Sequence, residues 1–447
     1  MSVEQFPATQ REWHWRVLML AWPIIVSNLS VPLVGLVDTA VVGQLPDPKY
    51  MGAVAIGATI FSSVFWVFGF LRMGTTGFVS QAAGAGDQQE VSYSVLRPML
   101  IAVVLGLLLI LLQQPIGWLA MRLMSAGDSV TAVVESYYAI RIFSAPATLV
   151  NYCILGCLIG MQRMRLALVL QLILNGANLF LDILFVLYLG WDSDGVALAS
   201  VISEYLAALV GLWWLRELLF PKWLRQSVSW GVLLNQERLR ALFEVNGNLF
   251  LRTLLLTSAF FFFTAQSAQF GVVVLAANAL LINLLQMLAY GLDGFAHAAE
   301  ALAGGAYGAK RRTAFQQAVI SSTLWAAVMA LLICLIYAVA GPSIINLMTV
   351  NTEVIAIANQ YLPWMIAAPI ISVWSYQFDG IFIGATKTKA MRNTVALSLL
   401  IYVVLALVLI PQWGNQGLWF SLMTFMALRG ITLGMAYPKL VKQHEWR

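Results

Sequence analysis

Residues 95–113 read VLRPMLIAVVLGLLLILLQ, and this stretch decides the fold class. A transmembrane helix needs roughly 20 predominantly apolar residues, and here they come with a single charged side chain, Arg97. Similar runs recur along the chain. They are continuous, whereas the strands of a membrane β-barrel alternate apolar and polar residues. The sequence therefore predicts an all-α integral membrane protein.

The composition of the whole chain supports this fold class. Of the 447 residues, 61% are hydrophobic and 10% are charged, and the mean hydropathy is +0.83. Soluble domains carry about 25% charged residues, so this chain cannot present an ordinary solvated surface. Soluble enzymes and nucleic-acid-binding proteins are thereby excluded.

Twelve apolar runs are long enough to cross a membrane. We predict helices at 15–43, 52–80, 95–113, 130–158, 166–190, 195–219, 240–264, 271–303, 314–340, 354–382, 391–411 and 416–437. With the N-terminus in the cytoplasm, 19 of the 25 Lys and Arg residues lie in cytoplasmic segments, and two, Lys49 and Arg122, lie outside. Because cytoplasmic loops are enriched in Lys and Arg, both termini are predicted to be cytoplasmic. The net charge of +5 then requires no nucleic-acid partner.

The two halves of the chain resemble each other at an offset near 222 residues. The matches include Ala145-Pro146 with Ala368-Pro369, and Gly156-Cys-Leu-Ile-Gly160 with Gly380-Ile-Phe-Ile-Gly384. Each half has six predicted spans, so both halves cross the membrane in the same direction, as in transporters built from parallel repeats. We expect two pseudo-symmetric six-helix lobes, with ligand sites within or between them. The predicted boundaries are an N-lobe at 1–219, a cytoplasmic linker at 220–239 and a C-lobe at 240–447.

Acidic residues inside the spans mark candidate ion or substrate paths, because each charge costs roughly 2.5–3.5 kcal/mol to place in hydrocarbon. They are Asp38, Asp182, Glu204, Asp293, Glu300 and Asp379. Asp182 ends a polar stripe on one face of the fifth span, since Gln171, Asn175, Asn178 and Asp182 recur at i, i+4, i+7 and i+11. The stripe either lines a polar cavity or supplies hydrogen bonds between helices. Glu204 either faces Asp182 or makes a helix contact.

The first span combines Asp38 with two prolines, Pro23 and Pro32. Proline removes a backbone hydrogen bond and kinks a helix, so this span is predicted to bend. The carboxyl group of Asp38 either exchanges a proton during transport or stays permanently protonated as a structural group.

The eighth span carries a second polar stripe, which consists of Gln286, Tyr290, Asp293, His297 and Glu300. At an offset of 221 residues, Asp293 corresponds to Arg72 in the second span. We hypothesise that Arg72 and Asp293 form an ion pair that closes the cytoplasmic side between the lobes. Alternatively, each charge is paired within its own lobe. His297 is either a hydrogen-bonding partner of Asp293 or a proton relay.

Nothing in the sequence provides a nucleotide-driven motor. The segment Gly304-Gly-Ala-Tyr-Gly308-Ala-Lys310 lacks the Gly-Lys-Ser/Thr ending of a phosphate-binding loop. A transporter of this design would use an ion gradient, so we predict H⁺ or Na⁺ as the coupling ion and no other cofactor.

Several motifs together resemble the MATE (multidrug and toxic compound extrusion) family, in particular its DinF-type bacterial branch. They are Trp22-Pro23-Ile, Asp38-Thr-Ala-Val-Val-Gly43, Asn246-Gly-Asn248-Leu-Phe-Leu-Arg252-Thr, Asp293-Gly-Phe-Ala-His-Ala-Ala-Glu300 and Asp379-Gly-Ile-Phe-Ile-Gly-Ala-Thr386. The resemblance covers nearly the whole chain. It implies alternating access by two lobes in the bacterial inner membrane, and antiport of H⁺ or Na⁺ against organic, often cationic and amphiphilic compounds. We expect a monomer without enzymatic activity.

The resemblance also implies roles for individual residues. Asp38 matches the family's first-helix acid and Pro23 its bend-forming proline, while Asn178 and Asp182 match the N-lobe cation site. We add Asn151, Asn175 and Ser200 to the predicted site, and a bound Na⁺ would be held by Asp38, Asn178 and Asp182. The sodium-coupled branch has acids in spans seven and ten, whereas here the middle of span seven, 253–264, has none and Asp379 lies near the cytoplasmic end. This favours protons over Na⁺.

Three other functions remain open at this stage. A flippase of lipid-linked precursors would need a strongly basic cavity, for which Arg72, Arg141 and Arg252 are the candidates. A membrane-embedded enzyme would need a constellation of catalytic residues, yet one histidine, His297, lies in a span. A membrane scaffold would not need acids in the bilayer.

Overall fold

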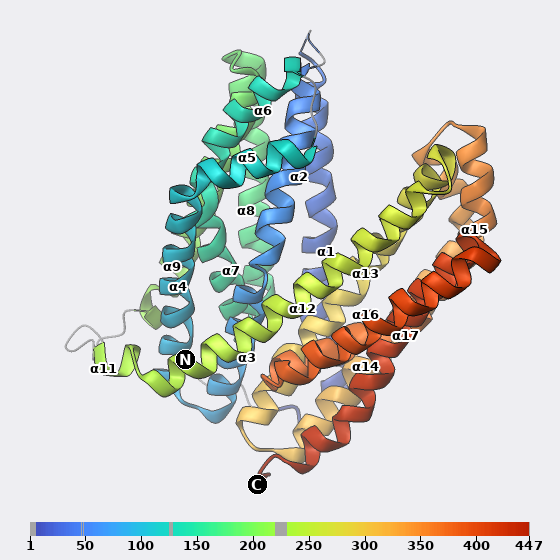
Figure 1. Ribbon diagram of the computed structural model, residues 1–447. Helices are drawn as coiled ribbons and strands as arrows, with labels where there is room; N and C mark the ends of the chain where they lie inside the picture. Colours follow the sequence, from blue (N-terminus) through green and yellow to red (C-terminus); the bar gives the residue numbers. More distant parts are fainter. Residues whose placement is uncertain (1–5, 46, 48, 125–127, 220–229, 447) are drawn as a thin grey trace. The chain divides into compact units, whose positions relative to one another are not determined.

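Helices form wherever the sequence carries a long apolar run, because backbone polar groups in a membrane must be satisfied within the segment itself. The computed structural model describes residues 6–45, 47, 49–124, 128–219 and 230–446. Within these ranges the regular structure is helical and contains no strand (Figure 1).

The helices of the first half of the chain include several short segments. They are α1 (Gln10–Val42), α2 (Lys49–Val67), α3 (Phe70–Ala85), α4 (Gln88–Leu111), α5 (Gln113–Met124), α6 (Asp128–Arg141), the 3₁₀ turn η1 (Ile142–Ser144), α7 (Ala145–Gly160), α8 (Met164–Asp182), the π-helical segment η2 (Ile183–Tyr188), α9 (Asp192–Leu219) and α11 (Trp230–Leu233). The second half contains α12 (Gln236–Ala268), α13 (Val272–Gly308), α14 (Arg312–Met348), α15 (Thr352–Gly384), α16 (Thr388–Trp413) and α17 (Asn415–Lys442).

The predicted membrane fold is confirmed. In the part of the chain that the structure describes, eleven helical segments are long and apolar enough to cross a membrane, and they correspond one for one to the second through twelfth predicted spans. The first predicted span corresponds to α1. The short helix α5 was not predicted. Its 12 residues cannot cross a bilayer, and a run of this length carries little periodic signal.

The helices group into two compact units. One unit contains Val26–Ala82 and Asp87–Phe243, and the other contains the chain up to Ile25, the short stretch Ala83–Gly86 and the chain from Glu244 onward. We call them the N-lobe unit and the C-lobe unit. The linker residues 220–229 lie outside the described residues. The helix α1 is shared, since the division between the units falls at Ile25–Val26.

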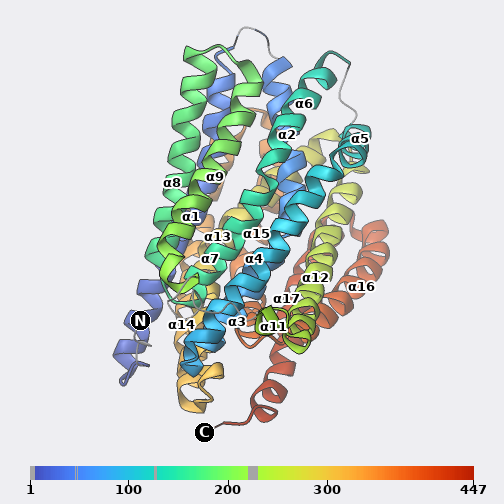
Figure 2. The same ribbon diagram turned by 90° about the vertical axis from the view of Figure 1, so that its left-hand side faces the viewer.

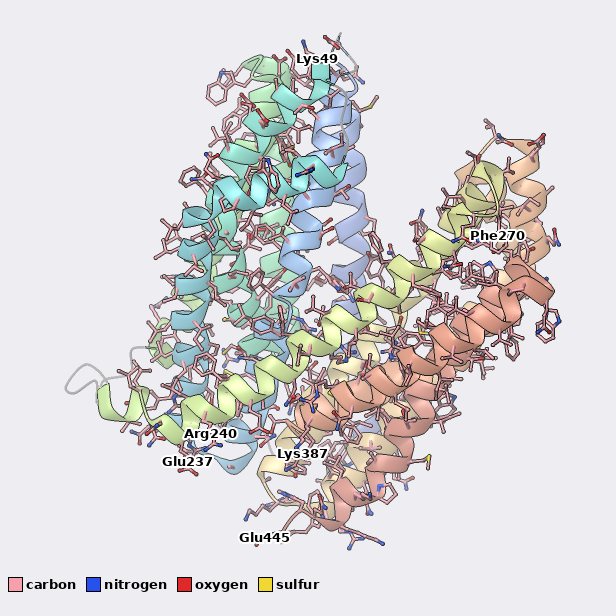
Figure 3. The ribbon with its side chains drawn as sticks, in the orientation of Figure 1. Lys49, Glu237, Arg240, Phe270, Lys387 and Glu445 are labelled. Atoms are coloured by element: carbon pink, nitrogen blue, oxygen red, sulfur yellow. The ribbon has the colours of Figure 1, made fainter. Side chains whose placement is uncertain are left out.

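Each unit has its own set of packed helices. In the N-lobe unit, α4 packs on α7, α8 on α9, and α2 on α6 (Figure 2). In the C-lobe unit, α13, α14 and α15 pack against one another, and α17 packs on both α15 and α16. Labelled residues mark the two ends of each unit (Figure 3). Lys49 lies at one end of the N-lobe unit and Arg240 at the opposite end, while Lys387 and Phe270 lie at opposite ends of the C-lobe unit.

The internal repeat is visible in how closely two pairs of helices approach. A Cβ added at Gly156 of α7 would lie 2.5 Å from the Arg72 carbonyl oxygen of α3. A Cβ added at Gly380 of α15 would lie 2.3 Å from the Ala296 carbonyl oxygen of α13. Small residues that let helix backbones touch are the usual basis of helix association in membranes. The matched Gly-xxx-Gly motifs thus form equivalent backbone contacts in the two units.

We therefore expect Gly380→Ala to destabilise the protein. The new methyl group must push α15 away from α13, and overpacking of this kind costs about 1–3 kcal/mol. The thermal unfolding midpoint of the purified protein in detergent should fall. The matched control is Gly247→Ala, on α12 in the same unit, where an added Cβ meets nothing within 4 Å. Equal midpoints for the two variants would contradict the assigned contact.

The chain's C-terminal segment folds back on the turn between α13 and α14. The His444 ring stacks on Tyr307 at 3.6 Å between ring centroids, and its Nε2 lies 2.9 Å from the Tyr307 carbonyl oxygen. Trp446 packs edge-on against both rings. Burial in this contact, helped by the nearby charges of Lys310 and Lys387, lowers the pKa of His444 below its ordinary value of 6.5.

This contact should weaken in acid. Because the pKa of His444 is lower in the folded state, the neutral ring keeps its full contribution above about pH 6.5, and that contribution is lost as the pH falls further. The measured quantity is the rate of proteolytic trimming of the C-terminal segment in the wild type divided by the rate in a His444→Phe control. This ratio should be several-fold higher at about pH 5.5 than at about pH 7.5. The same ratio at both pH values would show that the ring does not titrate in this contact.

Candidate functional site

Polar side chains from five helices gather in the interior of the N-lobe unit. We call them the N-lobe cluster, which consists of Asp38 from α1, Tyr137 and Arg141 from α6, Asn151 from α7, Asn178 and Asp182 from α8, and Ser200 and Glu204 from α9. Four of the five helices also carry the apolar residues that pack the unit. The cluster is therefore held by the same packing that forms the lobe.

An acid pair lies at the centre of the N-lobe cluster. The carboxyl groups of Asp38 and Asp182 lie within hydrogen-bonding reach of each other. Asp182 is fully buried, and neither of its carboxyl oxygens accepts a hydrogen bond from an N–H or O–H group of the described residues. Two carboxylates at this range repel when both are ionised, so such a pair is stabilised when it shares a proton or binds a cation.

The backbone departs from regular helix next to the cluster. The α-helix α8 ends at Asp182 and continues as the π-helical segment η2. The 3₁₀ turn η1 follows Arg141 directly and leads into Pro146 of α7, whose ring nitrogen cannot donate to the preceding turn. Such irregular turns inside helices are frequent at functional sites. Both of them here place a charged side chain of the cluster.

Glu204 makes its contacts with α7. The Asn151 amide Nδ2 donates to the Glu204 Oε2 at 2.8 Å and to the Glu204 carbonyl oxygen at 2.9 Å. The sequence left open whether Glu204 faces Asp182 or makes a helix contact, and in this structure its hydrogen bonds are made with α7. Two further predicted residues meet nearby, since Asn178 Nδ2 donates to Ser200 Oγ at 3.3 Å.

The polar stripe of α8 divides into two parts. Its first part joins α8 to α1, because Asn175 Nδ2 donates to Ser30 Oγ at 2.8 Å and Gln171 Nε2 donates to Asn175 Oδ1 at 3.0 Å. Its second part, Asn178 and Asp182, belongs to the cluster. Asn175, which we predicted in the site, thus forms a hydrogen bond between helices in this structure.

Three residues of the cluster, Tyr137, Arg141 and Glu204, were missing from the predicted site, although Glu204 was among the candidate acids of the spans. Arg141 acts electrostatically on Asp38, Asp182 and Glu204. It also lies within hydrogen-bonding reach of Tyr137. The sequence contained a signal for Arg141, since a cation inside a span needs an acidic partner, but it could not indicate which of the acids lay opposite.

The C-lobe unit contains a different charged centre. Asp379 Oδ2 accepts hydrogen bonds from the Nη2 atoms of Arg252 and of Arg429, the latter at 2.8 Å. All three residues are between 3% and 6% exposed. The charge of Asp379 is therefore already neutralised by two guanidinium groups, and a further cation would have to displace them. The middle of the seventh predicted span contains no acid, and this span contributes a cation, Arg252, to the charged centre.

The second predicted polar set is divided between the units. Arg72 lies half-buried on α3 in the N-lobe unit, whereas Asp293 and His297 are half-buried and Glu300 is buried on α13 in the C-lobe unit. Within its own unit, Asp293 acts electrostatically on Tyr290 and Tyr376. The ion pair between Arg72 and Asp293 stays a prediction.

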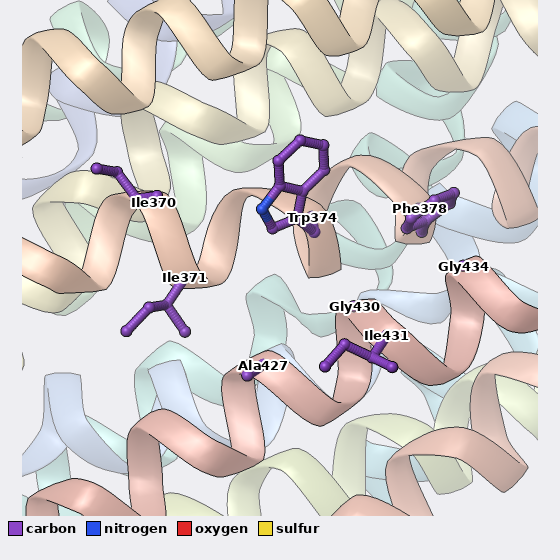
Figure 4. Close-up of a pocket in the computed structure, with 8 residues that line it drawn as sticks. All are labelled: Ile370, Ile371, Trp374, Phe378, Ala427, Gly430, Ile431 and Gly434. Carbon is purple, nitrogen blue, oxygen red and sulfur yellow. The ribbon is translucent and has the colours of Figure 1, made fainter.

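An apolar groove of about 440 Å³ lies between α15 and α17 (Figure 4). Trp374, Phe378 and Ile431 line it, and Gly430 and Gly434 form part of its floor. No lining residue carries a charge. Trp374 and Ile431 are exposed, so the groove suits a hydrocarbon environment and offers nothing to recognise an ion.

Two multi-helix lobes with a buried, ionisable cluster are typical of a membrane transporter. The MatE family model matches residues 23–184 and 249–408, one segment in each half of the chain. The protein belongs to the MatE family, which confirms the resemblance seen in its motifs.

Individual relatives agree with this family. The chain is 39% identical to the DNA damage-inducible protein F of Escherichia coli over 97% of its own length and 93% of that protein. It is 19% identical to the multidrug export protein MepA of Staphylococcus aureus, with 95% and 93% of the two chains covered. Among solved structures, the MATE transporter VcmN of Vibrio cholerae in the bent form has a TM-score of 0.82 at 22% identity, over 97% of this chain and 98% of that one.

The C-lobe centre should be essential for stability. Asp379→Asn leaves two buried guanidinium groups without a counter-charge, and removing one partner of a buried ion pair costs about 3–5 kcal/mol. The unfolding midpoint in detergent should fall far below that of the wild type. The control is Glu353→Gln at the exposed start of the same helix, which should change it little. If both variants unfold alike, Asp379 does not hold the two arginines.

Proposed function

We propose that this protein exports organic, often cationic and amphiphilic compounds across the bacterial cytoplasmic membrane in exchange for H⁺. The observation that carries the proposal is the acid pair of Asp38 and Asp182 in the interior of the N-lobe unit. A cationic compound and a proton both neutralise such a pair, so they compete for it. Competition for one set of charges is the simplest way to exchange one for the other.

The proposed cycle alternates the charge of the acid pair. When the pair is anionic, the N-lobe binds a cationic compound. A proton that enters from outside neutralises Asp38, weakens the attraction for the compound and changes the hydrogen bonds of α1. Because linkage is reciprocal, binding of the compound also promotes loss of the proton.

Bending of α1 near Pro23 would convert the charge change into movement. In support, α1 runs as one helix through Pro23, and the division between the two units falls two residues later, at Ile25–Val26. A bend at this point would move one part of α1 relative to the other without disrupting either unit. The solved structure of VcmN is described as a bent form, which is the kind of movement proposed here.

Protons are favoured over Na⁺ as the coupling ion. The acid of span ten, Asp379, is already bonded to two arginines. We further propose that the protein acts as a monomer with both termini in the cytoplasm, and that the gate pair of Arg72 and Asp293 closes the cytoplasmic side.

The flippase alternative is less favoured, because two of its three candidate arginines face acids. It would need arginines available to bind a pyrophosphate group. Arg252 is bonded to Asp379, and Arg141 lies among the acids of the N-lobe cluster.

The decisive variant is Asp38→Asn, which should abolish efflux driven by a pH gradient in proteoliposomes because the amide cannot carry the proton. The control is Asp47→Asn, an acid in the connection that follows the same helix, which should transport normally. Imposing pH and Na⁺ gradients separately identifies the coupling ion. Full pH-driven efflux by Asp38→Asn would refute the proposed role of the acid pair.

A further inference from the structure

The N-lobe cluster contains three carboxyl groups and one guanidinium group. Asp38, Asp182 and Glu204 come from three different helices, and Arg141 acts electrostatically on all of them. Arginine remains charged in proteins. The cluster therefore has a permanent positive charge of its own, which balances one carboxylate when the other two carboxyl groups are protonated.

Arg141 is not committed to one carboxylate. Its buried Nη1 has no hydrogen-bond acceptor among the described residues, in contrast to Arg252 and Arg429, which both donate to Asp379. Two rings of α2 face the guanidinium group, with the Phe61 centroid at 5.7 Å and the Phe65 centroid at 6.0 Å. Aromatic faces attract a cation, so these rings hold the charge beside the acids without neutralising it.

We propose that Arg141 is the resident counter-cation of the N-lobe cluster and that it excludes Na⁺ from the acid pair. This proposal rests on the proposed function, because it explains why a site of this kind would accept a proton rather than a metal ion.

The exclusion follows from the chemistry of the site. Carboxyl, amide and hydroxyl oxygens are the ligands that hard cations prefer, and Asp38, Asp182, Asn178 and Ser200 supply all three kinds. Na⁺ bound to them would have to share the acids with a fixed positive charge in a medium of low dielectric constant, where charges repel strongly. A proton avoids this cost because it adds to a single oxygen and forms a neutral group. A cationic organic compound can spread its charge over a larger volume.

The test uses Na⁺ alone as the probe, so it does not depend on knowing the transported compound. Thermal unfolding midpoints of the purified, full-length protein are compared in NaCl and in KCl at equal ionic strength. An ion that binds the folded state raises the midpoint. Arg141→Gln should be selectively stabilised by NaCl, with at least tenfold tighter Na⁺ binding than the wild type. The wild type and the charge-conserving Arg141→Lys should not distinguish the two salts.

Two further variants guard against a merely structural effect. Arg141→Gln combined with Asp182→Asn should lose the response to Na⁺, because one of the two acids is gone. If Arg141→Gln alone does not fold, Arg141→Gln combined with Glu204→Gln removes one charge of each sign, and it should still respond to Na⁺ through Asp38 and Asp182.

Transport assays then separate this proposal from the proposed function. In proteoliposomes, a Na⁺ gradient should become able to drive efflux by Arg141→Gln. If Arg141→Gln responds to NaCl and KCl alike and is not driven by a Na⁺ gradient, the role of Arg141 is overturned while proton-coupled efflux by the wild type stays intact. Efflux by the wild type that is driven by Na⁺ and not by H⁺ would overturn both proposals.

Discussion

The cost of a charge in hydrocarbon is the constraint on which the rest of this structure depends. A charged group inside a membrane must find a partner within the protein, and the two units satisfy this requirement differently. In the C-lobe unit, Asp379 bonds directly to Arg252 and Arg429 and the three side chains are almost fully buried. In the N-lobe unit, Arg141 lies among three acids without a hydrogen-bond acceptor for its buried Nη1 in the described part of the chain.

This difference assigns different tasks to two halves that share one packing plan. Both units bring a Gly-xxx-Gly helix into backbone contact with its neighbour, at Gly156 in one and Gly380 in the other. The fixed ion pairs of the C-lobe unit favour a rigid body. The acid pair of the N-lobe unit is not bonded to a guanidinium group in this way, which suits the proton exchange that we propose for it.

The proposed bend and the first acid of the proposed proton exchange both lie on α1. Asp38 lies in the second half of α1, which belongs to the N-lobe unit. Pro23 lies just before Ile25–Val26, where the chain leaves one unit and enters the other. The irregular turns after Arg141 and Asp182 add two further places where helices of the N-lobe unit depart from regular geometry. The proposed bend at Pro23 and the acid Asp38 thus lie on one helix, on either side of the division between the units.

The sequence by itself determined the helices, their order and the duplicated plan, because long apolar runs have one solution in a membrane and because the matched glycine motifs recur in each half. It also identified Asp38, Asn178 and Asp182, since acids and amides in such runs are costly. Only the tertiary structure decided that Asp38 meets Asp182, that Asn175 bonds to Ser30, and that Arg141 and Arg252 face different acids. Periodicity places a residue on a helix face, whereas the partner of that face depends on how helices far apart in the chain pack together.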